Sequence, residues 1–293
     1  FERFYNKLAA RSKVVHDKDF GTAKELVDWK AGIYHNWNNI SVLSQNVIDT
    51  ENKSLQYGAD FSSEIKLDLG DYYLMNGEHW ESTLLYAQVE KAFKYDQLGE
   101  IAKFKNAKIF FYTGDFGWAK TQLNALKAST SKLIANDAMQ LSITITDNIG
   151  IDTTEAPLLM FAQADLLAYQ NKNEDAMNLL DTLKLGYPYH AIADDILYKR
   201  YQINYKQKKY AAAVQNLENI VKDYADDILA DDAIYNLALI YDNELNNKLK
   251  AASYYKKIIF EHQGSIYAVD ARKRYRALRD ELKLDEGLEF ESN

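Results

Sequence analysis

From Phe61 onwards, apolar and polar residues follow a helical spacing, in pairs of segments joined by short polar turns. In the second segment of each pair, a small residue is followed by large apolar residues four and seven positions later. The small residues that open these second segments are Ser82, Ala119, Ala176, Ala213 and Ala251. A small side chain lets two antiparallel helices approach closely, and the larger ones fill the groove between them.

Each first segment contains a shorter couplet, in which a residue that is small in four of the five segments precedes a large one by three positions. The couplets are Gly70 with Tyr73, Ala107 with Phe110, Ala164 with Leu167, Gln202 with Tyr205, and Ala238 with Tyr241. The pattern therefore predicts five helix pairs. The chain has only 2 prolines and 12 glycines, which leaves little room for β-turns and favours an all-α protein.

The pairs recur at a fixed interval along the chain. The small residues of the second segments are 37, 57, 37 and 38 residues apart. The segment 187–195, which precedes a predicted first helix, has similar counterparts at 224–232 and at 262–270. A period in the thirties with a helical pattern is typical of a helix-turn-helix solenoid. The one long step has about 20 surplus residues, which indicate an extra helix near 131–148.

These patterns divide the chain into four parts. We expect a degenerate helical region at 1–60 and the repeat array at 61–262, with the extra helix inside it. A single capping helix at 263–284 and an acidic tail at 285–293 follow. The chain begins at Phe1 without Met, signal segment or lipid-anchor Cys, so we expect a mature or excised part of a longer protein.

Charge and composition narrow the class of partner. The net charge is −8, which disfavours nucleic acid and anionic membranes as partners. The cysteine count is 0, so disulfides and thiolate chemistry are excluded, whereas an oxidising envelope and the cytoplasm fit equally well. No apolar run of about 18 residues is present, so no transmembrane segment is expected.

The repeat resembles the tetratricopeptide repeat (TPR) family over roughly residues 61–282. Two features depart from that family: the period exceeds its usual value of about 34 residues, and the proline that closes a repeat is present only at Pro188. The long period, the Tyr-Pro … Ala-Asp-Asp opening and the Gly-Ser-x-Tyr-Ala closing are similar to envelope TPR proteins of Gram-negative bacteria. These include the lipoprotein of the outer-membrane β-barrel assembly machine and the periplasmic coordinator linked to the Tol–Pal system. The richness in Asn, Lys and Tyr is similar to TPR proteins of the Bacteroidota envelope.

The resemblance implies a right-handed superhelix whose first helices line a concave face. It also implies the periplasm or the outer-membrane periphery as the location, although the cytoplasm stays open. Aromatic anchors with mixed polar neighbours suit an extended peptide or a partner helix, although the same residues could be ordinary solvated groove positions. The candidate partner-binding residues are Asp71, Lys108, Tyr112, Phe161, Asp165, Tyr169, Lys199, Ile203, Tyr235, Leu239 and Asp242.

Acidic residues recur at the predicted helix starts. They are Asp194, Asp195, Asp226, Asp227, Asp231, Asp232 and Asp270. An acidic ladder could bind a basic partner or a divalent cation, but the register with helix starts favours helix capping. None of the five histidines has the spacing of a metal-binding helix pair, and no phosphate-binding loop, dinucleotide fingerprint or nucleophile elbow occurs. We therefore expect no metal, no cofactor and no catalytic residues.

Two functions fit this pattern. The first is a non-catalytic scaffold or adaptor that binds another protein in its groove, in an envelope complex for outer-membrane assembly, secretion or motility. The alternative is a glycan- or nutrient-binding envelope protein that embeds TPR helices among long loops. Such proteins carry aromatic-rich insertions, whereas the single insertion here has no aromatic residue. An enzyme or enzyme accessory ranks third. The sequence leaves open the partner's identity, the oligomeric state and the role of residues 1–60.

Overall fold

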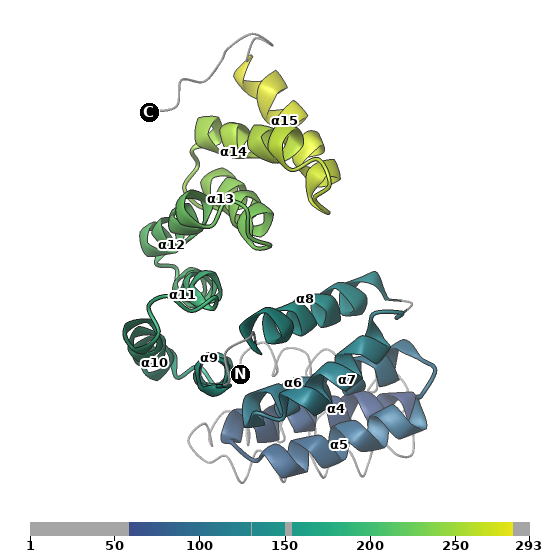
Figure 1. The fold of residues 1–293 in the computed structure, drawn as a ribbon. Coiled ribbons are helices and arrows are strands. Elements are labelled where there is room, and N and C mark those ends of the chain that lie inside the picture. The colour runs from purple at the N-terminus through teal and green to yellow at the C-terminus, as the bar shows by residue number, and fades with distance from the viewer. Residues whose placement is uncertain (1–58, 130, 150–153, 284–293) are drawn as a thin grey trace, which may run out of the picture. The chain divides into compact units, whose positions relative to one another are not determined.

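The computed structural model describes residues 59–129, 131–149 and 154–283, and every regular element in these ranges is an α-helix (Figure 1). The prediction of an all-α solenoid is confirmed, because the helices follow one another along the chain and pack mainly on their neighbours. The interpretations of residues 1–58 and of the acidic tail lie outside the described residues. The chain forms two compact units, with the boundary between Ile145 and Thr146.

The first unit contains two helix pairs. Each helix packs against the next one along the chain, and the elements are α4 (Ala59–Asn76), α5 (His79–Ala92), α6 (Gln97–Thr113) and α7 (Phe116–Leu126). The helix α8 (Lys132–Ile149) follows and contains the unit boundary. It occupies the segment where the surplus residues predict an additional helix.

The second unit contains three helix pairs and a final single helix. The pairs are α9 (Ala156–Tyr169) with α10 (Asn173–Gly186), α11 (Ala193–Lys206) with α12 (Tyr210–Asp223), and α13 (Ala230–Asn243) with α14 (Lys248–Glu261), and the last helix is α15 (Ala268–Leu282). The first helices of the pairs, α9, α11 and α13, each have 14 residues and begin 37 residues apart.

Small buried residues allow the close helix packing that the sequence predicts. In the second helices, Ser82, Ala119, Ala176, Ala213 and Ala251 all have 0% exposure. Ser82 adds a hydrogen bond, because its Oγ donates to the carbonyl oxygen of Gly70 at 2.8 Å. In the first helices, Gly70, Ala107, Ala164 and Ala238 are also buried.

The couplet predicted in α11 is wrong by one residue. Gln202 and Tyr205 are exposed, whereas Tyr201 and Asn204 are 8% and 6% exposed. Tyr201 lies 37 residues before Ala238, so a large ring occupies the position that is small in the other first helices. The ring is accommodated because its hydroxyl donates to Asn236 Oδ1 at 2.9 Å, on the next first helix.

The turn inside every pair contains one residue with a left-handed backbone. These residues are Gly77, Gly114, Asn171, Lys208 and Asn246, with φ between 48° and 90°. They recur at the same intervals as the small residues of the second helices. A left-handed residue after a helix turns the chain and lets the next helix fold back. Sequence repeat and backbone repeat therefore coincide.

Candidate functional site

All eleven candidate residues lie on the first helices of their pairs, and we refer to that side of each unit as its first-helix surface. In the first unit, Asp71 lies on α4, and Lys108 and Tyr112 lie on α6. In the second unit they occupy α9 (Phe161, Asp165, Tyr169), α11 (Lys199, Ile203) and α13 (Tyr235, Leu239, Asp242). Each of the two units therefore has a first-helix surface of its own.

Three candidates are in the interior. Tyr112, Phe161 and Ile203 are 3%, 6% and 2% exposed, so a partner cannot reach their side chains in this structure. Their proposed role as contact residues does not fit these positions. Phe161 is the positional equivalent of Tyr235 and lacks the hydroxyl that draws a tyrosine toward polar neighbours. Lys108 lies over the Tyr112 ring, with Nζ 5.4 Å from the ring centroid.

Ion pairs join successive first helices in both units. Lys199 Nζ on α11 lies 2.8 Å from Asp165 Oδ1 on α9, and both side chains are 16% exposed. In the first unit, Lys105 Nζ on α6 lies 2.5 and 2.7 Å from the two carboxylate oxygens of Asp71 on α4. Each aspartate directly follows its helix's small residue, Gly70 or Ala164. These charges therefore bind one another within the array, which sequence analysis missed.

A buried tyrosine from the second helix also binds the aspartate in the first unit. The Tyr86 hydroxyl donates to Asp71 Oδ1 at 2.7 Å, and Tyr86 is 0% exposed. Tyr255 occupies the equivalent position on α14 and donates to Asp242 Oδ2 at 3.3 Å. In both units, therefore, a core tyrosine of a second helix donates a hydrogen bond to a carboxylate on the first helix of the same pair.

Tyr86→Phe tests this anchor. We expect the variant to lose about 1 kcal/mol of unfolding free energy, because a hydrogen bond to a carboxylate disappears while Lys105 still holds Asp71. Urea unfolding followed by tryptophan fluorescence measures it, since all four tryptophans (Trp29, Trp37, Trp80 and Trp118) precede the second unit.

Tyr95→Phe is the matched control for this substitution. Tyr95 is 94% exposed, so removing its hydroxyl should leave the transition unchanged. An unchanged Tyr86→Phe transition would mean that the Asp71 carboxylate gains nothing from the tyrosine.

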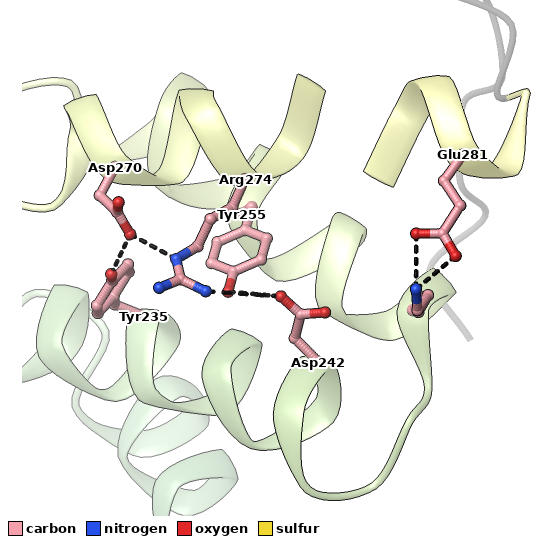
Figure 2. Close-up of polar contacts among 7 residues, drawn as sticks. Tyr235, Asp242, Tyr255, Asp270, Arg274 and Glu281 are labelled. Carbon is pink, nitrogen blue, oxygen red and sulfur yellow. Dashed lines mark hydrogen bonds and ion pairs between the residues drawn. The ribbon is translucent and has the colours of Figure 1, made fainter. Parts of the chain in front are cut away.

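A polar network links α13, α14 and α15 in the second unit (Figure 2). The Tyr235 hydroxyl and Arg274 Nε both donate to Asp270 Oδ2, at 2.5 and 2.6 Å. Arg274 Nη1 is 3.8 Å from Asp242 Oδ2, the oxygen that accepts from Tyr255. These contacts place Arg274 between two carboxylates on different helices. Farther along α15, Glu281 pairs with Lys248 at the start of α14.

The protonation equilibria of this network follow from its hydrogen bonds and its burial. Hydrogen bonds from Tyr235 and Arg274 hold the pKa of Asp270 below its usual range. Burial, followed by the hydrogen bond to Asp270, raises the pKa of Tyr235 to about 12. At neutral pH the carboxylate is therefore ionised and the tyrosine neutral, which keeps both hydrogen bonds formed.

The network continues along the first-helix surface toward α11. The Tyr267 ring stacks on Tyr235 with centroids 4.2 Å apart, and its hydroxyl donates to Asp232 Oδ1 at 2.5 Å. Asn236 Nδ2 donates to the Tyr198 hydroxyl at 3.2 Å. Burial raises the pKa of Asp232 to about 6, the Tyr267 hydrogen bond opposes that shift, and Asp231 adds to it.

Sequence analysis missed several members of the network. Arg274, Asn236 and Tyr267 were not candidates, and neither was Tyr198, although it lies 37 residues before Tyr235. Applying the repeat interval to Tyr235 would have identified Tyr198. For Arg274, Asn236 and Tyr267, the sequence has no comparable signal that predicts their hydrogen-bond partners.

The helix-capping interpretation of the aspartates holds only in part. The residues at the N-caps of α11, α13 and α15 are Ile192, Leu229 and Tyr267, and none makes a side-chain capping bond. Five of the aspartates lie two or three residues later, in the first turn, where the helix dipole still favours a negative charge. Asp226 and Asp227 lie in the loop before α13. Asp231 Oδ1 accepts from the backbone N–H of Asp232 at 2.9 Å, whereas Asp195 accepts from Asn148 Nδ2 at 2.7 Å and Asp232 and Asp270 accept from tyrosines.

Among the described residues, no group of three or more His, Cys, Asp and Glu residues has the arrangement of a metal site. None of the described helices is long and apolar enough to cross a membrane. No model of a known protein family matches the chain, and no curated protein matches it either.

Proposed function

We propose that the chain is a non-catalytic TPR-type scaffold or adaptor, which binds a segment of another protein along the first-helix surface of its second unit. The TPR assignment is supported by the helix pairs, by their small buried contact residues and by the turn that recurs with the same interval. The resemblance to bacterial envelope proteins supports a periplasmic or outer-membrane-associated complex as the setting.

One observation carries the proposal. Side chains of the first helices α11 and α13 and of the final helix α15 are bound to one another through Tyr198, Asn236, Tyr235 and Asp270. A surface whose polar and aromatic groups are already fixed loses little side-chain entropy when a partner binds. Such pre-organisation suits recognition of an extended or helical segment.

Two positions on this surface lie outside this network, although Gln202 accepts a hydrogen bond from Lys199 Nζ at 2.6 Å. Gln202 on α11 is exposed and Leu239 on α13 is half-buried, and they occupy the same position of the repeat. We expect the double variant Gln202→Arg with Leu239→Arg, the groove variant, to lose its partner by at least about tenfold in captured amount, because two long charged side chains then occupy the binding path.

The assay is affinity purification from the native cell envelope with quantitative mass spectrometry. The matched control is Gln215→Arg with Leu249→Arg, two exposed positions on the second helices α12 and α14. Circular dichroism confirms that both proteins are folded. A partner list unchanged in the groove variant would remove the first-helix surface as the binding site, and glycan binding would then be tested with an oligosaccharide array.

A further inference from the structure

The three loops that precede α11, α13 and α15 share one backbone conformation. In each, two successive turns are closed by hydrogen bonds, His190 N to Tyr187 O and Ala193 N to His190 O in the first loop. The same two bonds recur 37 residues later and again in the loop before α15. The segments 187–195, 224–232 and 262–270, each a loop with the helical turn after it, are together called the loop edge.

Each loop of the loop edge exposes a large apolar side chain, and the third segment also exposes Val269. Tyr189, Ile228 and Ile266 are 99%, 56% and 70% exposed. Ile228 and Ile266 occupy the same position, so the shared backbone conformation turns both outward. Single exposed apolar residues are ordinary, whereas apolar residues exposed in three successive loops, two of them at one repeat position, form a surface that a partner can cover.

The second and third loops of the edge pack on one core. Tyr267, in the last loop, bonds to Asp232 in the first turn of α13. Tyr224, in the second loop, and Tyr267 both pack against the hydrophobic core of the second unit.

The three segments of the loop edge contain seven aspartates and no lysine or arginine. In the third segment, Asp270 is paired with Arg274 of α15. Asp226 and Asp227 are exposed. Burial raises the pKa of Asp194, and the charges of Asp227 and of Asp147 on α8 raise it further. The aspartates produce a negative field, which repels nucleic acid and anionic lipid and attracts a basic segment. The exposed apolar groups lie within this field.

We infer that the loop edge docks a basic segment of a partner protein, whose lysine or arginine residues face the aspartates and whose apolar residues cover Tyr189, Ile228 and Ile266. The inference rests on the proposed function, because it assigns a second contact to the same protein partner and gives the segment that makes this contact a positive charge. The aspartates attract the segment from a distance, and the apolar row fixes its position.

The first test uses synthetic peptides with the purified full chain. A fluorescent peptide that alternates lysine with leucine is compared with one that alternates lysine with serine and one that alternates glutamate with leucine. We expect only the first to bind well, with an affinity that falls as salt is added. Equal binding of the lysine–serine peptide would show attraction by charge alone and would overturn the inference.

Paired variants then locate the contact. Ile228→Ser with Ile266→Ser, the edge variant, and Asp226→Asn with Asp227→Asn should each weaken binding of the lysine–leucine peptide by about tenfold or more. The matched controls, Leu185→Ser with Leu249→Ser and Glu174→Gln with Asp175→Asn, change exposed residues elsewhere on the second unit and should leave the affinity unchanged. An edge variant that binds as well as wild type overturns the inference.

The native partner separates this inference from the proposed function. A partner lost by the edge variant places the second contact on the loop edge. A partner kept by the edge variant but lost by the groove variant would support the proposed function and contradict the inference about the loop edge. A partner kept by both variants would contradict both.

A second copy of the chain is the other possible occupant of the loop edge, because α15 exposes the basic residues Arg272, Lys273 and Arg276. Sedimentation equilibrium measures whether the chain forms a dimer. A dimer that the edge variant dissociates would make the occupant a second copy and would overturn the inference.

Discussion

Gly70→Ala is expected to destabilise the first unit by about 2 kcal/mol, although alanine is the better helix former by about 1 kcal/mol. Gly70 lies inside α4, where a Cβ atom would come within 2.9 Å of Tyr86 Cδ1 and Cζ and closer still to Cε1. The Tyr86 ring cannot withdraw, because it is 0% exposed and its hydroxyl is bound to Asp71. The added methyl group must therefore separate α4 from α5.

Gly117→Ala is the control with the opposite expected sign. Gly117 also lies in a helix, α7, but a Cβ atom there meets nothing within 4 Å. The better helix propensity of alanine should then stabilise the unit by up to about 1 kcal/mol. Urea unfolding followed by tryptophan fluorescence compares the two variants. If Gly70→Ala also stabilised the protein, the close approach of α4 and α5 would be wrong.

The helix pairs could be predicted because their determinants are local. A small residue followed by large ones at helical spacing is readable within one segment, and Ala213 and Ala251 are buried as this pattern predicts. The register of α11 could not be read locally, because Tyr201 occupies a small-residue position and Gln202 with Tyr205 gives a similar pattern one residue later. The repeat interval, applied strictly, would have corrected it.

The site was predicted less completely because its contacts cross between repeats. Tyr235 and Asp270 are 35 residues apart, as are Tyr267 and Asp232. Such contacts depend on how far each first helix is rotated against the previous one, which no single segment encodes. The same rotation decides exposure: Ile203 is buried, whereas Tyr235 reaches the surface and is half-buried. A repeat pattern therefore identifies the helices of a surface better than its accessible atoms.

Asp232→Asn is expected to stabilise the second unit at neutral pH by up to about 3 kcal/mol. The folded pKa of Asp232 is about 6, against an ordinary value of 3.8. The folded state therefore binds the proton more tightly than the unfolded state. Below pH 3.8 both states are protonated and this preference is fully present; as pH rises toward 6 it is lost. Asparagine does not titrate, and its Oδ1 can still accept from Tyr267.

The groups around Asp232 support this direction. Asp231 precedes it and raises its pKa, Tyr267 faces it from the loop before α15, and Tyr198 and Tyr201 face it from α11. None of these is a cation, and the Tyr267 hydrogen bond and the dipole of α13 do not offset the burial of the ionised carboxylate. The advantage of the variant should shrink as pH falls from neutral toward 3.8.

Asp270→Asn is the matched substitution at the equivalent position, 38 residues later, and its sign is reversed. Tyr235 and Arg274 lower the pKa of Asp270, so its carboxylate contributes stability above pH 3.8 that is lost as pH falls. The loss at neutral pH should be only about 0.5 to 1 kcal/mol, because solvent screens this exposed side chain.

Urea unfolding at a series of pH values, followed by far-ultraviolet circular dichroism, measures the unfolding free energy of both variants. Tryptophan fluorescence confirms that the first unit is unchanged. Two variants with the same sign at neutral pH would contradict the assignment of one carboxylate as strained by burial and the other as stabilised by its partners.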